Sequence, residues 1–181
     1  MAEHCYVITG GPGSGKSSLI AALAAEGVSH MPEAGRAIIQ DQVAIGGTAL
    51  PWGDKEAFAE LMLGWEMRSW REAGALQRPV IFDRGVPDVI GYLQVSGLRV
   101  PPHLRKAANL CRYNRQVFIA PHWPGIFAQD NERRQDAAEA AATCRAMAEV
   151  YAALGYELCP LPLAPIAERV RFVRAHLAKA G

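Results

Sequence analysis

The sequence lacks the features that mark exported, membrane-spanning or disulfide-stapled proteins. Its four cysteines, at positions 5, 111, 144 and 159, form no C-x-x-C pair and have no regular spacing. They therefore indicate neither a zinc site nor a disulfide framework. No run of 18 apolar residues occurs, and no basic segment precedes the short apolar run at the N-terminus. We expect a cytoplasmic protein that does not interact with membranes.

An excess of positive charge is also missing. The 19 basic and 18 acidic residues give a net charge of +1, which argues against a general binder of nucleic acids or of anionic membranes. Lysine is scarce, with four Lys against fifteen Arg. Arginine binds phosphate through a planar fork, so the bias fits a local phosphate site, although a GC-rich genome produces the same bias.

Size and patterning predict one α/β domain over residues 1–181. A chain of this length buries roughly 70% of its unfolded surface, which is enough for a hydrophobic core. Apolar segments with strand-like and helix-like periods alternate, which is typical of a parallel sheet covered by helices on both faces. The expected strands are residues 5–9, 28–31, 79–82, 116–120 and 156–159. The expected helices are residues 17–26, 33–43, 54–74, 86–95, 102–112, 131–154 and 165–178.

Within the helix expected over residues 54–74, Asp54 is positioned to cap the first turn. Phe58, Leu61, Met62 and Trp65 fall at i, i+3, i+4 and i+7. This spacing predicts one apolar stripe that faces the core.

The strongest motif is G-x-x-x-x-G-K-[ST] at residues 10–17, which follows a predicted strand and opens a predicted helix. In this context the backbone N–H groups of the loop and of the helix N-terminus bind phosphate oxygens. Lys16 is expected to reach the β- and γ-phosphates of ATP, and the Ser17 hydroxyl to ligate Mg²⁺. A glycine turn without function is the alternative. The predicted nucleotide-binding residues are Gly11, Pro12, Gly13, Ser14, Gly15, Lys16, Ser17 and Ser18.

Candidate catalytic groups follow two other predicted strands. Asp83 ends the apolar run at residues 80–82, and it is expected either to hold Mg²⁺ or to accept a proton from a substrate hydroxyl. Its alternative role is to cap the following helix. Arg84 lies at the same edge of the sheet, where ligands of α/β folds bind, and is expected to clamp phosphate. Glu33 follows the second strand and is expected to activate a hydroxyl; the alternative is a helix-start glutamate favoured by the helix dipole.

Two segments are expected to complete the site. Residues 121–134 contain Arg133 and Arg134 and are predicted to form a lid that closes over the phosphates and neutralises charge in the transition state. The alternative for these two arginines is a solvated pair. Residues 46–74 form an insertion on the side where an acceptor is expected to bind.

These motifs together resemble a family of small bacterial predicted ATPases with an AAA-type domain. They are also similar to the ribosylnicotinamide-kinase portion of NAD-biosynthetic regulators. The matching stretches are GGPGSGKSSL, PEAGRAII, FDRGVPDVIGY, YNRQVFIAPHWPGIF and DNERR. The resemblance implies a three-layer P-loop NTPase, with a nucleotide-kinase-like sheet of strand order 2-3-1-4-5, ATP on the first loop and an Arg-bearing lid. It also implies that Asp83 or Glu33 is the base and that Arg84 is a phosphate ligand, but it implies no substrate.

Two function classes remain open. The first is a kinase that transfers the γ-phosphate of ATP, with Mg²⁺, to a small hydroxylated acceptor. The second is a nucleotide-dependent regulatory or binding protein with slow ATPase activity. The insertion at residues 46–74 favours the kinase, and the sequence leaves the oligomeric state open.

Overall fold

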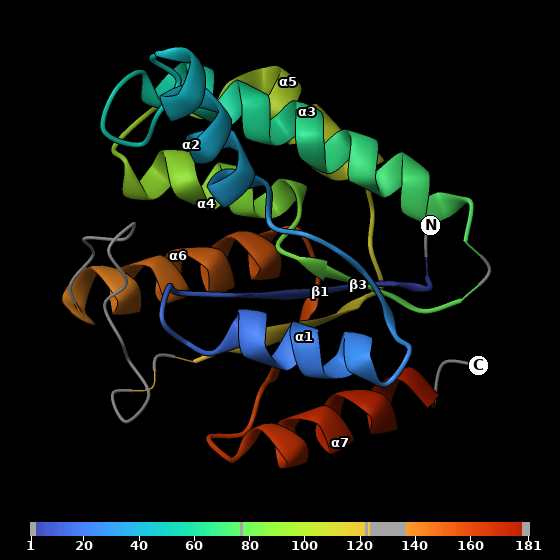
Figure 1. Cartoon of the computed structure of the whole chain (residues 1–181). Helices are drawn as coiled ribbons and strands as arrows, with labels where there is room; N and C mark the ends of the chain where they lie inside the picture. The colour runs from blue at the N-terminus through green and yellow to red at the C-terminus, as the bar shows by residue number, and fades with distance from the viewer. Residues whose placement is uncertain (1–2, 77, 122, 124–136, 179–181) are drawn as a thin grey trace.

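A five-stranded, all-parallel sheet forms the centre of the molecule (Figure 1). The computed structural model describes residues 3–76, 78–121, 123 and 137–178. The strand order is β2-β3-β1-β4-β5, which confirms the predicted α/β fold and its order. The strands are β1 (Cys5–Gly10), β2 (Ser29–Met31), β3 (Val80–Asp83), β4 (Gln116–Ala120) and β5 (Glu157–Pro160).

The register of the three central strands brings separate segments of sequence to one edge of the sheet. Ile8 of β1 lies opposite Asp83 of β3, so β3 ends two residues before β1 does at Gly10. On the other side of β3, Met31 lies opposite Phe82. Because all strands are parallel, the chain leaves each of them at the same edge. The loop after β1 and the turns after β2 and β3 therefore converge there.

Helices cover both faces of the sheet in three layers, and one face carries more of them (Figure 1). On one side lie α1 and α7, and on the other α6 and α4 lie near the sheet with α2, α3 and α5 beyond them. The helices are α1 (Lys16–Ala25), α2 (Ala34–Ile45), α3 (Lys55–Gly74), α4 (Val86–Val95), α5 (Pro102–Leu110), α6 (Ala137–Ala153) and α7 (Ile166–Leu177). The start that the sequence predicts for the helix at residue 131 lies outside the described residues.

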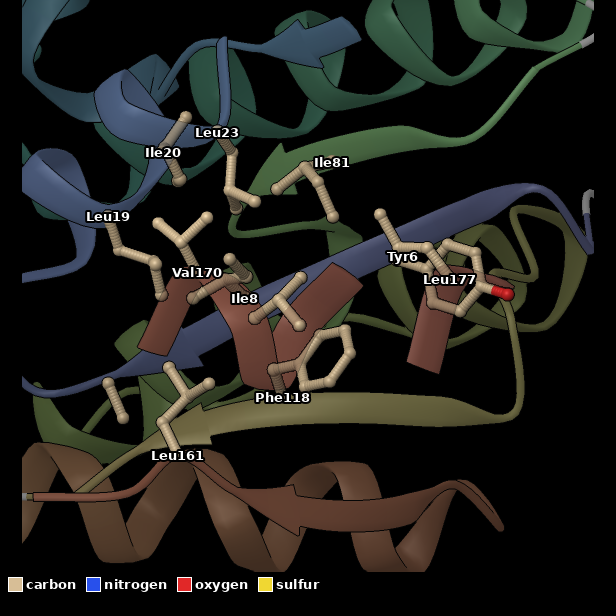
Figure 2. Close-up of a cluster of buried hydrophobic side chains, with 12 residues drawn as sticks. Tyr6, Ile8, Leu19, Ile20, Leu23, Ile81, Phe118, Leu161, Val170 and Leu177 are labelled. Atoms are coloured by element: carbon tan, nitrogen blue, oxygen red, sulfur yellow. The ribbon is translucent and has the colours of Figure 1, made fainter. Parts of the chain in front are cut away.

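The thinner face is closed by a continuous apolar cluster (Figure 2). Ile8 and Phe118 of the sheet meet Leu19 and Leu23 of α1 and Val170 of α7, and all five are buried. Complete burial of one such side chain stabilises a fold by about 1.5–3 kcal/mol. This cluster therefore fixes α1, and with it the loop at the N-terminus of α1, against the sheet.

Helix α3 begins as predicted but presents a different face to the core. The Asp54 carboxylate accepts a hydrogen bond from the backbone N–H of Ala57 at 2.9 Å. The prediction of one buried stripe is wrong for Leu61, which is 42% exposed, while Phe58 is buried. The physical reason is that α3 packs between α2 and α4, so its buried face is turned toward both of them. That face consists of Phe58, Ala59, Leu63, Glu66, Ser69 and Ala73.

The helices of the described part of the chain are too short or too polar to cross a membrane.

Candidate functional site

The glycine-rich loop joins β1 directly to α1, as its motif predicts. Gly10, Gly13 and Gly15 have φ values of 130°, 69° and 75°, a region that side chains rarely adopt. Space is limited as well: a Cβ atom on Gly10 would lie 2.3 Å from the carbonyl oxygen of Ala120, and one on Gly11 would lie 2.3 Å from a backbone carbonyl of α6. The loop therefore depends on glycine both for its turn and for its close approach to its neighbours.

Lys16 is buried inside this loop. Its ammonium group donates to the carbonyl oxygens of Gly11 at 2.7 Å and Gly10 at 3.3 Å, and to Ser14 Oγ at 3.3 Å. The Ser14 hydroxyl in turn donates to the Gly11 carbonyl at 2.8 Å. The positive charge is thus held within the loop whose backbone is expected to receive phosphate.

The N-terminus of α1 provides further anion-binding groups. The helix begins at Lys16, and Ser17 and Ser18 in its first turn are exposed. The first N–H groups of a helix have no carbonyl partner within the helix, and the helix dipole makes this end partially positive. Ser17 also presents its hydroxyl here. This arrangement suits the phosphates of a nucleotide and a cation bound to them.

Arg169 of α7 supports the loop from outside, a contact that sequence reasoning missed. Its side chain is 2% exposed, and Nη1 donates to the carbonyl oxygen of Ser14 at 3.2 Å. Because a peptide unit is planar and trans, a Ser14 carbonyl that points toward Arg169 turns the Gly15 N–H the opposite way. Burial lowers the pKa of Arg169, and its Nε atom is buried without a hydrogen-bond partner. The only signal in the sequence was an arginine on the apolar face of the last helix.

Asp83 ends β3 beside this loop. It is 7% exposed, and its Oδ1 atom is buried without a hydrogen-bond partner. Burial and the neighbouring Glu33 raise the pKa of Asp83, while Lys16 and Arg84 lower it. The alternative of a helix cap is not what the structure contains, because the N-cap of α4 is Gly85. Asp83 instead keeps an oxygen atom available for a cation or a proton.

Arg84 links the ends of the strands to one another. It is the one residue other than glycine with positive φ in the described part of the chain, at 76°. Such backbone strain is typical of functional sites and persists where contacts enforce it. Arg84 donates to Glu33 Oε1 at 3.3 Å, to the Gly10 carbonyl at 3.1 Å and to Asp88 Oδ1 at 3.1 Å. Burial lowers the pKa of Arg84, but the carboxylates of Glu33, Asp88 and Asp83 raise it by more than burial lowers it. The guanidinium therefore remains charged.

Glu33 lies at the N-cap of α2, directly after β2. Its side chain forms no capping hydrogen bond to the helix and instead pairs with Arg84. Its position at the N-cap leaves the helix-dipole alternative open, and the structure brings Glu33 together with Arg84.

Asp88 accepts hydrogen bonds from several parts of the site, and the sequence analysis missed it as a functional residue. Its Oδ1 atom accepts from Thr9 Oγ1 at 2.5 Å and from Arg84, and its Oδ2 atom accepts from the Tyr151 hydroxyl at 2.6 Å and from the Gly85 N–H at 3.0 Å. It joins β1, α4 and α6 around Arg84. A carboxylate in an otherwise apolar helix was the available signal.

Glu66 of α3 is a second missed residue. It is 4% exposed and projects from the buried face of its helix. Burial, Asp88 and Asp83 raise the pKa of Glu66 well above its usual range. The signal was a glutamate eight residues after Phe58, on the same side of the helix.

The remaining predicted groups are described only in part. Arg133 and Arg134 lie outside the described residues, as does most of the expected lid over residues 121–134. The insertion at residues 46–74 is described and includes α3, which contributes Glu66. A groove between α2 and α3 is lined by residues such as Ile38, Leu61 and Trp65, two of which belong to this insertion, and by none of the predicted catalytic or nucleotide-binding residues.

A metal site made of side chains alone is not present among the described residues, where His, Cys, Asp and Glu form no suitable group of three. Nucleotide-bound Mg²⁺ does not need one, because phosphates and water supply most of its ligands. The Ser17 hydroxyl and the unpartnered Asp83 oxygen fit this lesser requirement.

Known structures share this architecture. Deoxyadenosine kinase from M. mycoides, solved with the products dCMP and dCDP, has a TM-score of 0.70 at 13% identity over 97% of this chain and 99% of that one. Thymidylate kinase from Ehrlichia chaffeensis has a TM-score of 0.64 at 13% identity over 98% and 100%. The NadR protein in complex with NR has a TM-score of 0.69 at 14% identity over 96% of this chain. The chain spans half the length of NadR, with 50% of that chain covered.

These similarities establish a P-loop NTPase fold of the nucleotide-kinase type, and at such low identity they establish the fold alone. A search of curated protein sequences gives no match. A family model matches residues 5–169, from the first residue of β1 to the arginine that supports the phosphate loop, so it includes every described part of the site. The chain therefore belongs to the AAA domain family, and its fold is that of a P-loop nucleotide-binding protein.

Proposed function

We propose that the protein is a kinase that transfers the γ-phosphate of ATP to a hydroxyl group of a small acceptor. The observation that carries this proposal is the convergence of the Lys16 loop with Asp83, Arg84 and Glu33 at one edge of the sheet. Phosphoryl transfer needs a phosphate cradle, positive charge and a carboxylate near the attacking hydroxyl, with little covalent chemistry from the protein. The three groups are linked directly, because Arg84 bonds both the loop carbonyl of Gly10 and the Glu33 carboxylate.

The site suits Mg²⁺ held between the nucleotide and the protein. Ser17 lies in the first turn of the helix that follows the loop, and Asp83 has an oxygen atom with no partner among the described residues. Mg²⁺ would neutralise part of the charge on the phosphates when bound. In this proposal Ser17 ligates it, and Asp83 holds it directly or through water.

Glu33 and Asp83 are both candidates for the base that accepts the hydroxyl proton. Glu33 is oriented by its bond to Arg84, whereas Asp83 is buried and has a raised pKa, which favours proton uptake. Arg84 uses Nε and Nη1 for contacts within the protein. Its proposed role is to hold the site together and to place a positive charge beside the transferred phosphate.

The relatives of similar fold support a nucleoside-like acceptor. They include deoxyadenosine kinase and NadR bound to NR. The lid remains part of this proposal: Arg133 and Arg134 close over the phosphates and act in the transition state.

The proposal is tested by measuring ADP formation from MgATP in the presence of single acceptors. A kinase consumes ATP faster with its acceptor and forms a phosphorylated product, which mass spectrometry identifies. A regulatory protein hydrolyses ATP slowly at a rate that no acceptor changes, and that result would assign the second function class instead.

A further inference from the structure

Glu66 is a buried carboxyl group that the proposed transfer of phosphate does not use. It is 4% exposed, whereas Glu60 and Glu72 on the same helix are exposed and pair with His103 and Arg68. Within the described ranges, no hydrogen bond or ion pair reaches the Glu66 carboxyl group. Burial of a polar group without a partner is costly. The Glu66 oxygens are not among the fully buried, unpartnered atoms of the described residues, so they keep enough access to bind a group from outside the chain.

The face of α3 that carries Glu66 runs past the reaction centre. Phe58, Met62 and Glu66 are spaced by four residues and lie on one side of the helix. A Cβ atom on Gly35 would lie 3.7 Å from the Phe58 ring, 3.8 Å from Glu33 Oε1 and 3.9 Å from Met62 Sδ. This face of α3 is therefore in contact with the Glu33 region, and Glu66 lies one turn beyond Met62.

Helix α3 packs against α4, which begins shortly after Asp83 and Arg84 at the end of β3, and the charges around Glu66 agree with this placement. After burial, Asp88 and Asp83 are the largest causes that raise its pKa, and Arg84 opposes them. Glu66 in turn raises the pKa of Tyr113, whose hydroxyl accepts a hydrogen bond from the backbone N–H of Val86. Its carboxyl group thus lies near the turn that holds Asp83 and Arg84.

The carboxylates near Glu66 repel an acceptor molecule that carries negative charge. A phosphate monoester carries a charge of about −1.5 to −2 at pH 7. It would lie beside Glu33 and Asp83, while the Nε and Nη1 donors of Arg84 are already used by Glu33, Gly10 and Asp88. An uncharged or cationic acceptor avoids this repulsion.

An aromatic pair lies next to the same region, with Phe58 buried and Tyr92 half-buried. The Phe58 ring lies edge-on to the Tyr92 ring, with centroids 5.4 Å apart. The Phe58 ring and the Glu33 carboxylate also both lie beside Gly35. The half-buried Tyr92 ring is the one of the two that a flat heterocycle can pack against. A molecule that joins a ring to a polyol has an apolar part for the aromatic pair and hydroxyl groups for Glu66.

We propose that Glu66 hydrogen-bonds a hydroxyl group of an unphosphorylated, ring-bearing polyol of the nucleoside class, and that the site rejects acceptors that already carry a phosphate. This inference rests on the proposed function in one respect, since it places the acceptor beside Asp83 and Glu33.

The test is calorimetric titration of the full chain, with Mg²⁺ and a non-hydrolysable ATP analogue present. The probes are the common ribonucleosides and deoxyribonucleosides, nicotinamide riboside, and the matching 5′-monophosphates. The variants are Glu66→Met, which removes the polar group, Glu66→Asp, which retracts it, and Glu66→Gln, which keeps both hydrogen-bond donor and acceptor. Glu72→Met, on the exposed side of α3, is the matched control.

We expect at least one nucleoside to bind at least tenfold more tightly than its monophosphate. Glu66→Met and Glu66→Asp should each weaken that binding fivefold or more, while Glu66→Gln and Glu72→Met change it less than threefold and the affinity for the ATP analogue is unchanged. If Glu66→Met does not fold, the contrast between the Asp and Gln variants decides. Tighter binding of monophosphates, no binding by any probe, or a smaller effect of Glu66→Asp than fivefold would overturn the inference. Nucleoside binding that depends on Glu66 without phosphate transfer would instead contradict the proposed kinase and leave the Glu66 subsite standing.

Discussion

The two halves of the site are built in different ways. The phosphate side consists of one continuous loop, residues 10–17, whose glycines, lysine and following helix lie next to one another in the sequence. The side where we propose that the acceptor binds consists of Glu33 at the start of α2, Asp83 of β3, Glu66 of α3 and Asp88 of α4, which come from separate segments of the chain. The first half works through backbone geometry that a short motif encodes. The second half depends on packing, so its chemistry is visible only after the strands and helices are in place.

The phosphate side should lose the most from a single change. Lys16→Ala removes the ammonium group that donates to Gly10, Gly11 and Ser14 in the loop. We expect kcat/KM for ATP to fall by about a thousandfold, in the upper range for loss of one electrostatic stabiliser. Steady-state kinetics and the melting temperature of the apo protein measure this. Lys55→Ala, at the exposed start of α3, is the control. Unchanged ATP affinity and turnover in a folded Lys16→Ala variant would remove the nucleotide site from this loop.

Asp83 tests whether the acceptor side takes part in the chemistry. Asp83→Asn keeps the shape of the side chain but removes its charge, and we expect kcat to fall by at least about a hundredfold, as is typical for a general base or its equivalent. The measurement is kcat at saturating ATP and acceptor. The control is Asp41→Asn, at an exposed position of α2. If Asp83→Asn turns over normally and Glu33→Gln does not, the base is Glu33.

Arg169 tests how far the loop depends on support from a distant helix. Arg169→Met removes the donor to the Ser14 carbonyl and a buried positive charge near the phosphates, and we expect a loss of about tenfold in affinity for ATP, within the range for one charge-assisted hydrogen bond. The loss should be similar for ATP, GTP and inorganic tripolyphosphate, because the effect acts through the phosphate cradle.

Arg171→Met, on the exposed side of α7, should leave all three affinities unchanged. A loss confined to ATP would show that Arg169 acts on the base of the nucleotide and not on the loop.

The smallest expected effect concerns the pH dependence of stability on the acceptor side. The pKa of Glu66 is raised in the folded state by burial, Asp88 and Asp83, with smaller contributions from Arg84, which lowers it, and Glu33. The folded protein therefore binds the proton more tightly than the unfolded chain. The stabilisation that this bound proton provides is complete below the pKa of Glu66 in the unfolded chain. It is lost progressively as the pH rises through the pKa of Glu66 in the folded protein. Glu66→Gln does not titrate, so its advantage over the natural protein should grow with pH.

Melting temperatures between pH 4.5 and pH 8, without nucleotide and with EDTA, measure that advantage. We expect the two proteins to melt together near pH 4.5 and the variant to melt higher near pH 8, by about 2–4 °C for each kcal/mol of difference. Parallel melting curves across this range would show that the Glu66 carboxyl group does not titrate differently in the folded protein.

Much of the architecture follows from local patterns in the sequence. The strands are short, three of them end in glycine, aspartate or proline (Gly10, Asp83 and Pro160), and all five lie close to the predicted ranges. The P-loop is an eight-residue motif whose context was predicted correctly, because its glycines, its lysine and the helix after it act through nearest neighbours. Asp83 and Glu33 were predicted to lie at one edge for a related reason: they come at or just after the end of a strand, and parallel strands deliver their ends to one edge.

The tertiary structure alone decided which of the polar side chains meet. Asp88, Glu66 and Arg169 each lie on a helix among apolar residues, and no local pattern distinguishes a buried charge from an exposed one. The stripe predicted for α3 failed at Leu61 for the same reason, since periodicity gives the spacing of a face but not the direction in which neighbouring helices turn it. Periodicity arises from the backbone of one segment, whereas burial and the pairing of charges arise from contacts between segments. That difference is why the sequence revealed the phosphate loop, and the packed fold revealed the network around Arg84.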